Sequence, residues 1–269
     1  EIKFIEGTEI TKYSRTKNGI ELTTGTGEKI ESPIVIFSDG ANSKFAKDPG
    51  NIFRNKKNTM TGIKAYYKGI AGFHDKNYVE LHFLKDLLPG YFWIFPLPDN
   101  QFNVGLGMPS ELVSEKKINL PSELLRIIET DPVLSHRFSE AEMEGDIRGH
   151  FLPLFTRKSQ ISGERFMLCG DAASLINPAT GAGIGQAMQS GRFAGWQALK
   201  CFEKNDFSAD FMGNYDNTLY EKIWKENRRY LMLRKLIIKF GFSLNTVIRA
   251  GSNSASLKNI ILNQLILAP

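Results

Sequence analysis

A carboxylate and a glycine-rich turn lie close together in the second half of the chain. Residues 166–169 form an apolar run typical of a short buried strand, and Gly170 and Asp171 follow it directly. Beyond Pro178 the chain enters a helical pattern through Gly181, Ala182, Gly183 and Ile184. This order places one carboxylate at a strand end and a row of backbone N–H groups at the positive end of a helix dipole. Such a site suits a cofactor with ribose-type hydroxyls and a group that becomes anionic on reduction, whereas the structural alternative is a close helix–sheet crossing that requires glycine.

A second aspartate and glycine follow an apolar run near the N-terminus. Residues 34–37 are continuously apolar, as expected for a strand covered on both faces, and Asp39 and Gly40 come just after them. An ordinary Asp-Gly turn would explain this pair on its own. Because two such pairs each follow a buried-type strand, we expect both to line one sheet edge that contacts a ligand.

The elements that must position these residues follow from the apolar periodicity. Residues 2–38 predict several short strands, starting at residues 2–5 and separated by glycine turns. Turn residues favour an antiparallel sheet for the next strands, predicted at 60–67, 78–83, 91–95 and 103–106. Residues 151–154 predict an extended segment that leads the chain back to the motif containing Gly170 and Asp171. Helices are predicted at 121–138, 183–202, 215–240 and 257–267.

The helical pattern of residues 183–202 is rich in small residues. Small side chains let a helix approach its neighbour closely. We therefore expect this helix to pack tightly against a sheet or a flat ligand.

The composition is that of a globular protein and excludes several classes of function. The chain has 269 residues, of which 42% are hydrophobic and 23% charged, and its net charge is +5. No dense Lys/Arg run is interleaved with aromatic residues, so no nucleic-acid partner is expected. Cys169 and Cys201 match neither a metal-ligand spacing nor a disulfide framework, which favours a reducing, cytoplasmic setting. No metal site and no catalytic side chain is assigned, so the chemistry would come from a cofactor.

Three ordered motifs resemble the geranylgeranyl reductase family of FAD-dependent oxidoreductases, a branch of the hydroxylase-like flavoproteins. Residues 38–43 (SDGANS) look like the family's Asp-Gly motif. Residues 91–96 (YFWIFP) and 103–107 (NVGLG) are similar to segments of its substrate domain. The third motif runs from Gly170 to Gly191 and contains the aspartate and the glycine-rich turn described above.

The resemblance implies that the cofactor is FAD, reduced by NAD(P)H or another electron donor. Asp171, after Gly170, would accept hydrogen bonds from the ribityl chain of the flavin. The N–H groups from Gly181 to Ile184, next to Pro178, would face the pyrimidine edge and stabilise the anionic reduced flavin. Asp39 and Gly40 would lie near the pyrophosphate or the approach of the reductant.

The resemblance also implies a pocket for a small hydrophobic substrate. Its aromatic lining over the flavin ring would come from Tyr91, Trp93 and Phe95. These residues alternate, so one face of a strand presents all three, and plain sheet packing would give the same pattern.

The chain departs from the family pattern in two places. Ala182 stands where the family commonly has glutamate, so a carboxylate near the flavin is missing. No Gly-x-Gly-x-x-Gly follows an N-terminal strand, and Gly105-Leu106-Gly107 does not supply it because position 110 is serine. Since the chain also begins abruptly at Glu1, we expect a fragment of a longer FAD-binding protein that by itself binds FAD weakly or not at all.

The implied fold is α/β plus α+β. A partial, Rossmann-like FAD-binding domain is expected at residues 1–50 and 151–205. An antiparallel β substrate domain with a helix would interrupt it at residues 51–150, and a C-terminal helical region would occupy residues 206–269.

The expected activity of the parent protein is the reduction of carbon–carbon double bonds in an isoprenoid or similar hydrophobic substrate. FAD-dependent hydroxylation or halogenation is the alternative within enzymes, and a non-catalytic module that lost cofactor use is the alternative outside them. Basic residues between Lys222 and Lys239 accompany apolar ones. This pattern fits either peripheral contact with an anionic membrane or a helix with a solvated basic face.

Overall fold

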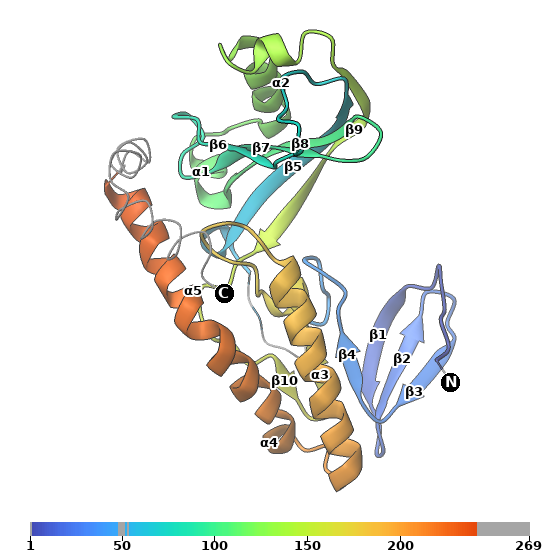
Figure 1. The fold of residues 1–269 in the computed structure, drawn as a ribbon. Coiled ribbons are helices and arrows are strands. Elements are labelled where there is room, and N and C mark those ends of the chain that lie inside the picture. Colours follow the sequence, from blue (N-terminus) through green and yellow to red (C-terminus); the bar gives the residue numbers. More distant parts are fainter. Residues whose placement is uncertain (1, 48–51, 53, 241–269) are drawn as a thin grey trace. The chain divides into compact units, whose positions relative to one another are not determined.

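The computed structural model describes residues 2–47, 52 and 54–240 of the chain (Figure 1). They fall into two compact units. The first unit is built from residues 2–60 and 151–228, and the second from residues 61–150 together with 229–240. The helix expected at 257–267 lies outside the described residues. The mixture of α/β and antiparallel elements with C-terminal helices confirms the predicted fold class.

The first unit begins with a small antiparallel sheet. Its strands are β1 (Ile10–Arg15), β2 (Ile20–Thr24) and β3 (Lys29–Ser32), in that order. Residues 2–5 were expected to open this sheet, but they form no strand, and Ile2 and Phe4 are 95% and 83% exposed. Apolar residues there have no neighbouring strand to pair with among the described residues, so the apolar pattern alone was misleading.

A second sheet of the first unit carries both the Asp39-Gly40 and the Gly170-Asp171 pair. It has the order β10 (Ser162–Gly163), β11 (Phe166–Leu168), β4 (Val35–Phe37), and β11 runs parallel to β4. All three residues of β11 are buried, which confirms the predicted buried strand. The prediction that residues 34–37 are covered on both faces is wrong, because Ile36 is 39% exposed. In the described part of the chain β4 is the last strand of its sheet, so fewer elements cover it than cover β11.

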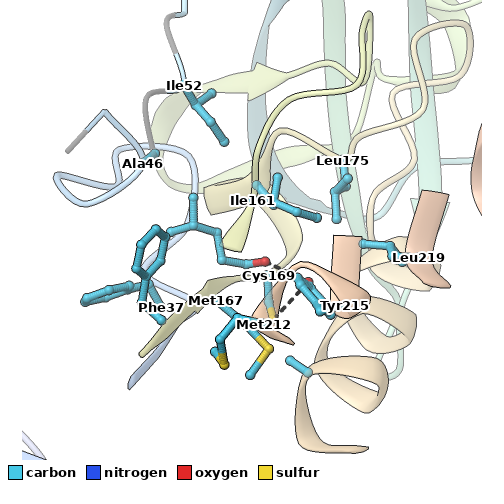
Figure 2. Packing of buried hydrophobic residues seen from close by; sticks show 14 of the residues in the cluster. Phe37, Ala46, Ile52, Ile161, Met167, Cys169, Leu175, Met212, Tyr215 and Leu219 are labelled. Carbon is cyan, nitrogen blue, oxygen red and sulfur yellow. Dashed lines mark hydrogen bonds between the residues drawn. The ribbon is translucent and has the colours of Figure 1, made fainter. Parts of the chain in front are cut away.

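Helices and short turns complete the first unit. They are η1 (Lys56–Asn58), η3 (Gly170–Ala173), α3 (Ile184–Lys204), α4 (Ala209–Met212) and the part of α5 (Asn214–Phe240) up to residue 228. Figure 2 shows part of the core, where Tyr215 at the start of α5 donates a 2.7 Å hydrogen bond to the Leu168 carbonyl. The Sγ atom of Cys169 lies 3.5 Å from the Tyr215 hydroxyl. Burial raises the pKa of Cys169, so this thiol is a core group and not a reactive one.

Helix α3 buries a different face from the one its glycines suggest. Its buried residues are Ser190, Ala194, Gln197 and Cys201. A Cβ added at Gly185, Gly191 or Gly195 would meet nothing within 4 Å among the described residues. Close packing occurs instead at Ala187, whose Cβ would lie 3.0 Å from one added at Gly170, and packing of the glycine face against a flat ligand stays a prediction.

The second unit is a five-stranded sheet covered on one face. Its strand order is β6 (Glu80–His82), β7 (Tyr91–Pro96), β8 (Gln101–Pro109), β5 (Thr59–Lys68), β9 (Glu142–Pro153). The pairs β6–β7 and β7–β8 are antiparallel, as predicted for these strands. Phe92 and Ile94 of β7 pack in one buried cluster with Leu124 and Ile127 of helix α2.

Helix α2 (Leu120–Thr130) ends earlier than the predicted span of 121–138. Asp131 stops it, because its carboxylate accepts hydrogen bonds from the backbone N–H groups of Val133 and Leu134 at 2.9 and 3.1 Å. The following proline also disfavours helical geometry at Asp131. Two shorter helices in this unit are α1 (Ser110–Glu115) and η2 (Ser135–Arg137).

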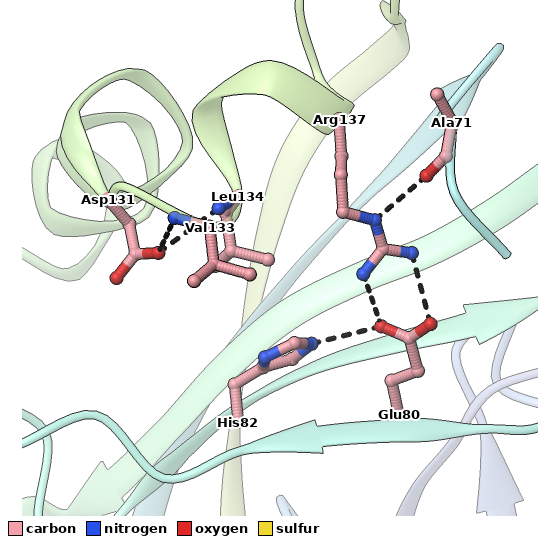
Figure 3. A network of polar contacts seen from close by, with 7 residues as sticks. All are labelled: Ala71, Glu80, His82, Asp131, Val133, Leu134 and Arg137. Atoms are coloured by element: carbon pink, nitrogen blue, oxygen red, sulfur yellow. Dashed lines mark hydrogen bonds and ion pairs between the residues drawn. The ribbon is translucent and has the colours of Figure 1, made fainter.

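A charged cluster ties η2 to strand β6 (Figure 3). Arg137 makes two hydrogen bonds to the Glu80 carboxylate, at 2.6 and 3.0 Å, and His82 Nε2 lies 3.1 Å from the same group. Arg137 also lies over the ring of Phe73 and donates to the Ala71 carbonyl. Partial burial acts to raise the pKa of Glu80, but the bonds from Arg137 and His82 outweigh it and leave that pKa below its usual value.

Candidate functional site

The Asp39-Gly40 and Gly170-Asp171 sequences leave the same edge of one sheet. In the parallel pair Leu168 lies opposite Phe37, and the Cys169 N–H donates a 2.9 Å hydrogen bond to the Phe37 carbonyl. The chain then continues into Asp39 on one side and Asp171 on the other. This confirms the predicted meeting of the two sequences. Asp39 is exposed and borders a cavity of about 540 Å³ that residues of β1, β2 and β4 also line.

Gly170 and Gly40 adopt backbone conformations that favour glycine, with φ of +56° and +79°. The Gly170 N–H donates to the Ser190 hydroxyl of α3 at 2.9 Å. A Cβ at position 170 would lie 3.0 Å from the Cβ of Ala187. Gly170 therefore lets α3 approach the strand end where Asp171 begins.

Asn177 organises the loop that leads into α3. Its buried side chain accepts hydrogen bonds from the N–H groups of Ala179 and Thr180, at 2.9 and 3.1 Å. Its backbone N–H donates to the Ala182 carbonyl, and its carbonyl accepts from Gly181. Pro178 is buried within this turn. Asparagine before proline is a turn signal, so the sequence did contain a hint of this role.

Part of the expected row of N–H donors is used inside the loop. The Gly181 N–H bonds to the Asn177 carbonyl at 3.0 Å, and the Ala182 N–H bonds to the Thr180 hydroxyl at 3.2 Å. Helix α3 begins at Ile184, and its N-cap residue Gly183 makes no side-chain cap. Because the first N–H groups of an α-helix lack acceptors within that helix, those at the start of α3 are open to a ligand, whereas those of Gly181 and Ala182 bond within the loop.

The carboxylate of Asp171 lies close to Gly183 at the start of α3. A Cβ added at Gly183 would lie 3.4 Å from Oδ1 of Asp171 and 3.0 Å from a side-chain carbon of Ile176. A residue larger than glycine would push into the space between the carboxylate and the helix start. The positive end of the helix dipole also favours a carboxylate there.

Arg54 joins the two loops, and the sequence analysis missed it. Its guanidinium donates hydrogen bonds to the carbonyls of Ala41, Asp171 and Ala172 and to the Ser174 hydroxyl. Burial lowers the pKa of Arg54, while the charges of Asp39 and Asp171 act to raise it. No local pattern marks this arginine, because its partners lie up to 120 residues away in the sequence.

The second unit presents a separate aromatic stripe. Tyr91, Trp93 and Phe95 share one face of β7, with ring centroids 5.9 Å apart for the first pair and 6.1 Å for the second. All three are partly exposed, whereas Phe92 and Ile94 between them are buried. The predicted alternation is therefore confirmed, and the role of the stripe as a substrate pocket stays a prediction.

A polar chain on neighbouring strands continues this stripe. Trp93 Nε1 donates to Asn103 Oδ1 at 2.8 Å. A Cβ at Gly105 would lie 2.3 Å from the indole, so this glycine of the NVGLG motif makes room for Trp93.

On the neighbouring strand β5, Lys64 Nζ donates to the Tyr66 hydroxyl at 3.0 Å. The hydrogen bond from Lys64, followed by its charge, lowers the pKa of Tyr66, and Asn103 contributes in the same direction. Neither Lys64 nor Tyr66 stood out in the sequence.

Two further features bear on what the site can do. Among the described residues, no group of three or more His, Cys, Asp or Glu side chains could hold a metal ion. No helix in that part of the chain is both long and apolar enough to cross a membrane.

No family model matches the chain, but comparison with individual proteins finds relatives that carry the same reductase name. It is 32% identical over 213 residues to a digeranylgeranylglycerophospholipid reductase of Methanococcus aeolicus, a match that covers 78% of this chain and 52% of the relative. A reductase of the same name from Methanocella arvoryzae is 26% identical over 264 residues, covering 97% of this chain and 63% of the relative. The chain thus spans about half the length of the curated relatives it matches first.

Solved structures show the same fold. A geranylgeranyl bacteriochlorophyll reductase-like protein of Thermoplasma acidophilum superposes with a TM-score of 0.76 at 21% identity, covering 86% of this chain and 58% of the other. A flavin-dependent halogenase superposes with a TM-score of 0.67 at 21% identity, covering 83% and 40%. The reductase relatives and the order of the three motifs agree with each other. The chain belongs to the geranylgeranyl reductase family of flavoproteins.

Proposed function

We propose that the first unit contributes to an FAD site at the edge where the loops of Asp39 and Asp171 meet. Asp171 would accept hydrogen bonds from hydroxyls of the cofactor, and the N–H groups from Ile184 onward would face the pyrimidine edge. Gly183 supports this fit, because a side chain there would press against Ile176 and come within 3.4 Å of the Asp171 carboxylate. Asp39 and Gly40, at the same edge, would lie near the pyrophosphate.

The reaction we propose is the reduction of carbon–carbon double bonds in an isoprenoid lipid. Reduced FAD would supply a hydride to one carbon of the double bond and solvent would supply a proton to the other, with NAD(P)H or another donor reducing the FAD again. The observation that carries this proposal is the match to curated digeranylgeranylglycerophospholipid reductases across 78% to 97% of the chain. The aromatic stripe of β7 offers partly exposed apolar surface of the kind that an isoprenoid chain would contact.

The test uses the full-length native protein under strictly anaerobic conditions. It is incubated with FAD, a chemical reductant and a lipid that carries geranylgeranyl chains, and the products are examined by mass spectrometry. The proposal predicts a gain of two hydrogen atoms for each double bond reduced. A parallel incubation in air with added halide completes the test, and turnover only in air, or an oxygen or halogen atom in the product, would contradict the proposal.

FAD-dependent hydroxylation or halogenation is the second candidate within enzymes. It is favoured by the structural likeness to a flavin-dependent halogenase, which concerns the fold alone. A non-catalytic module is the candidate outside enzymes, and Ala182 in place of the family's glutamate is the feature that favours it. An FAD titration of the full-length protein separates this last candidate from both enzymes.

We also propose a cytoplasmic protein that meets a membrane surface through α5. Both cysteines are free and buried, as expected in a reducing compartment. Lys222, Lys225, Arg228 and Arg229 are exposed on α5. Anionic vesicles should therefore retain the protein at low salt and release it at high salt, whereas neutral vesicles should not retain it.

A further inference from the structure

One side chain bonds to both loops of the candidate cofactor site. Arg54 Nη2 donates to the carbonyls of Asp171 and Ala172 at 3.0 and 2.9 Å, and Nε lies 3.3 Å from the Ser174 hydroxyl. Its Nη1 donates to the Ala41 carbonyl, in the loop after β4. A single planar group therefore spans the loop after β4 and the turn η3 after β11.

The bonding pattern argues against a direct role for Arg54 in binding an anion. A guanidinium has five N–H donors in a fixed fork. Four of them serve the loops in this structure, which leaves at most one for a ligand. A phosphate-binding arginine would instead direct a pair of N–H groups at its ligand.

The electrostatic environment favours a cation at position 54. Asp39 and Asp171 both lie close enough to stabilise the charged guanidinium, against the burial that disfavours it. Two carboxylates at one sheet edge repel each other, and a positive charge bonded to both loops offsets that repulsion. Neutralising position 54 would remove the bonds and the compensating charge together.

We propose that Arg54 is a positioning residue of the FAD site, which holds the loops of Asp39 and Asp171 in register through their backbone carbonyls. This inference rests on the proposed function, because the loops matter to FAD only if FAD binds there. A lysine cannot replace the planar fork, since it is a single point donor. Charge alone is therefore not expected to be sufficient.

The experiment compares Arg54→Gln and Arg54→Lys with wild type and with Arg157→Gln in the full-length native protein. Arg157 is an exposed residue of the same unit, so its variant makes the same charge change without removing the bonds of Arg54 to the loops. FAD affinity is measured by fluorescence titration, and backbone hydrogen exchange is measured without FAD. Both Arg54 variants should bind FAD about tenfold or more weakly. Their exchange should accelerate selectively at residues 39–43 and 170–175.

The two measurements separate the possible failures. If wild type binds FAD and both Arg54 variants bind it equally well with unchanged exchange, the inference about Arg54 is wrong and the proposed function stands. Faster exchange throughout the first unit would also overturn it, because that result describes general destabilisation. If wild type binds no FAD, the proposed function fails, and the exchange at the two loops still decides whether Arg54 holds them.

Discussion

The two units build their candidate sites by different means. In the first unit the candidate site is formed mainly by loop backbone, because glycines, an asparagine turn and Arg54 fix the loops that carry Asp39 and Asp171. In the second unit the side chains of Tyr91, Trp93 and Phe95 project from a sheet that α2 covers on its other face. This difference predicts which substitutions damage each unit. The first unit should be most sensitive to a change of backbone conformation in its loops, and the second to a loss of packing beneath its sheet.

The largest effect on this comparison should come from removing a large core ring of the second unit. Phe92 is fully buried on the face opposite the aromatic stripe. The Phe92→Ala variant should lose about 3–5 kcal/mol of unfolding free energy, because it leaves a cavity under the sheet. Urea denaturation measures this loss. Phe83→Ala, at a position 37% exposed, is the matched control and should lose much less unfolding free energy. Equal losses in the two variants would contradict the claim that burial determines the cost.

A smaller effect should come from adding one methyl group at a loop of the first unit. Gly170→Ala forces an alanine to a φ of +56° and brings its Cβ to 3.0 Å from that of Ala187. We expect a loss of about 1–2 kcal/mol in thermal or urea unfolding, together with weaker FAD binding. Gly191→Ala on the open face of α3 makes the same chemical change and should stabilise the helix by up to about 1 kcal/mol. A loss of the same size in both variants would contradict the backbone account.

The pH dependence of the charged cluster gives the smallest expected effect. The pKa of Glu80 is lowered in the folded state, so its contribution to stability is fully present above the unfolded value of 4.5 and is lost as the pH falls through the folded pKa. Glu80→Gln should therefore cost about 1 kcal/mol at pH 7, with the difference from wild type shrinking below pH 4.5. Urea unfolding at several pH values measures it. If the difference in unfolding free energy between wild type and Glu80→Gln grew on acidification, the prediction would be wrong.

Local patterns in the sequence were sufficient for several features of both units. The apolar run before Gly170 predicted the buried strand β11, and alternation predicted that Trp93 and Phe92 face opposite sides of β7. The meeting of Asp39 and Asp171 at one edge followed from two strands that end in the same way. In each case neighbouring residues carry the information.

Features that depend on distant partners could not be predicted in the same way. Arg54 bonds to carbonyls that any residue type could present, so its role leaves no pattern in the sequence. The use of the Gly181 N–H inside its own loop depends on how the chain folds back on Asn177. The exposure of Ile36 depends on which strands flank β4, and an apolar run does not specify its neighbours.

The central claim is that FAD binds at the loops of Asp39 and Asp171 in the first unit. A measurement of FAD affinity tests this claim most directly. FAD is titrated into the full-length protein as wild type, as Asp171→Ala and as Asp146→Ala, the last at an exposed aspartate of the second unit. We predict that Asp171→Ala weakens FAD binding by about 100-fold, equivalent to ~2.7 kcal/mol, and that Asp146→Ala leaves it unchanged. Equal FAD affinity in wild type and Asp171→Ala would contradict the account.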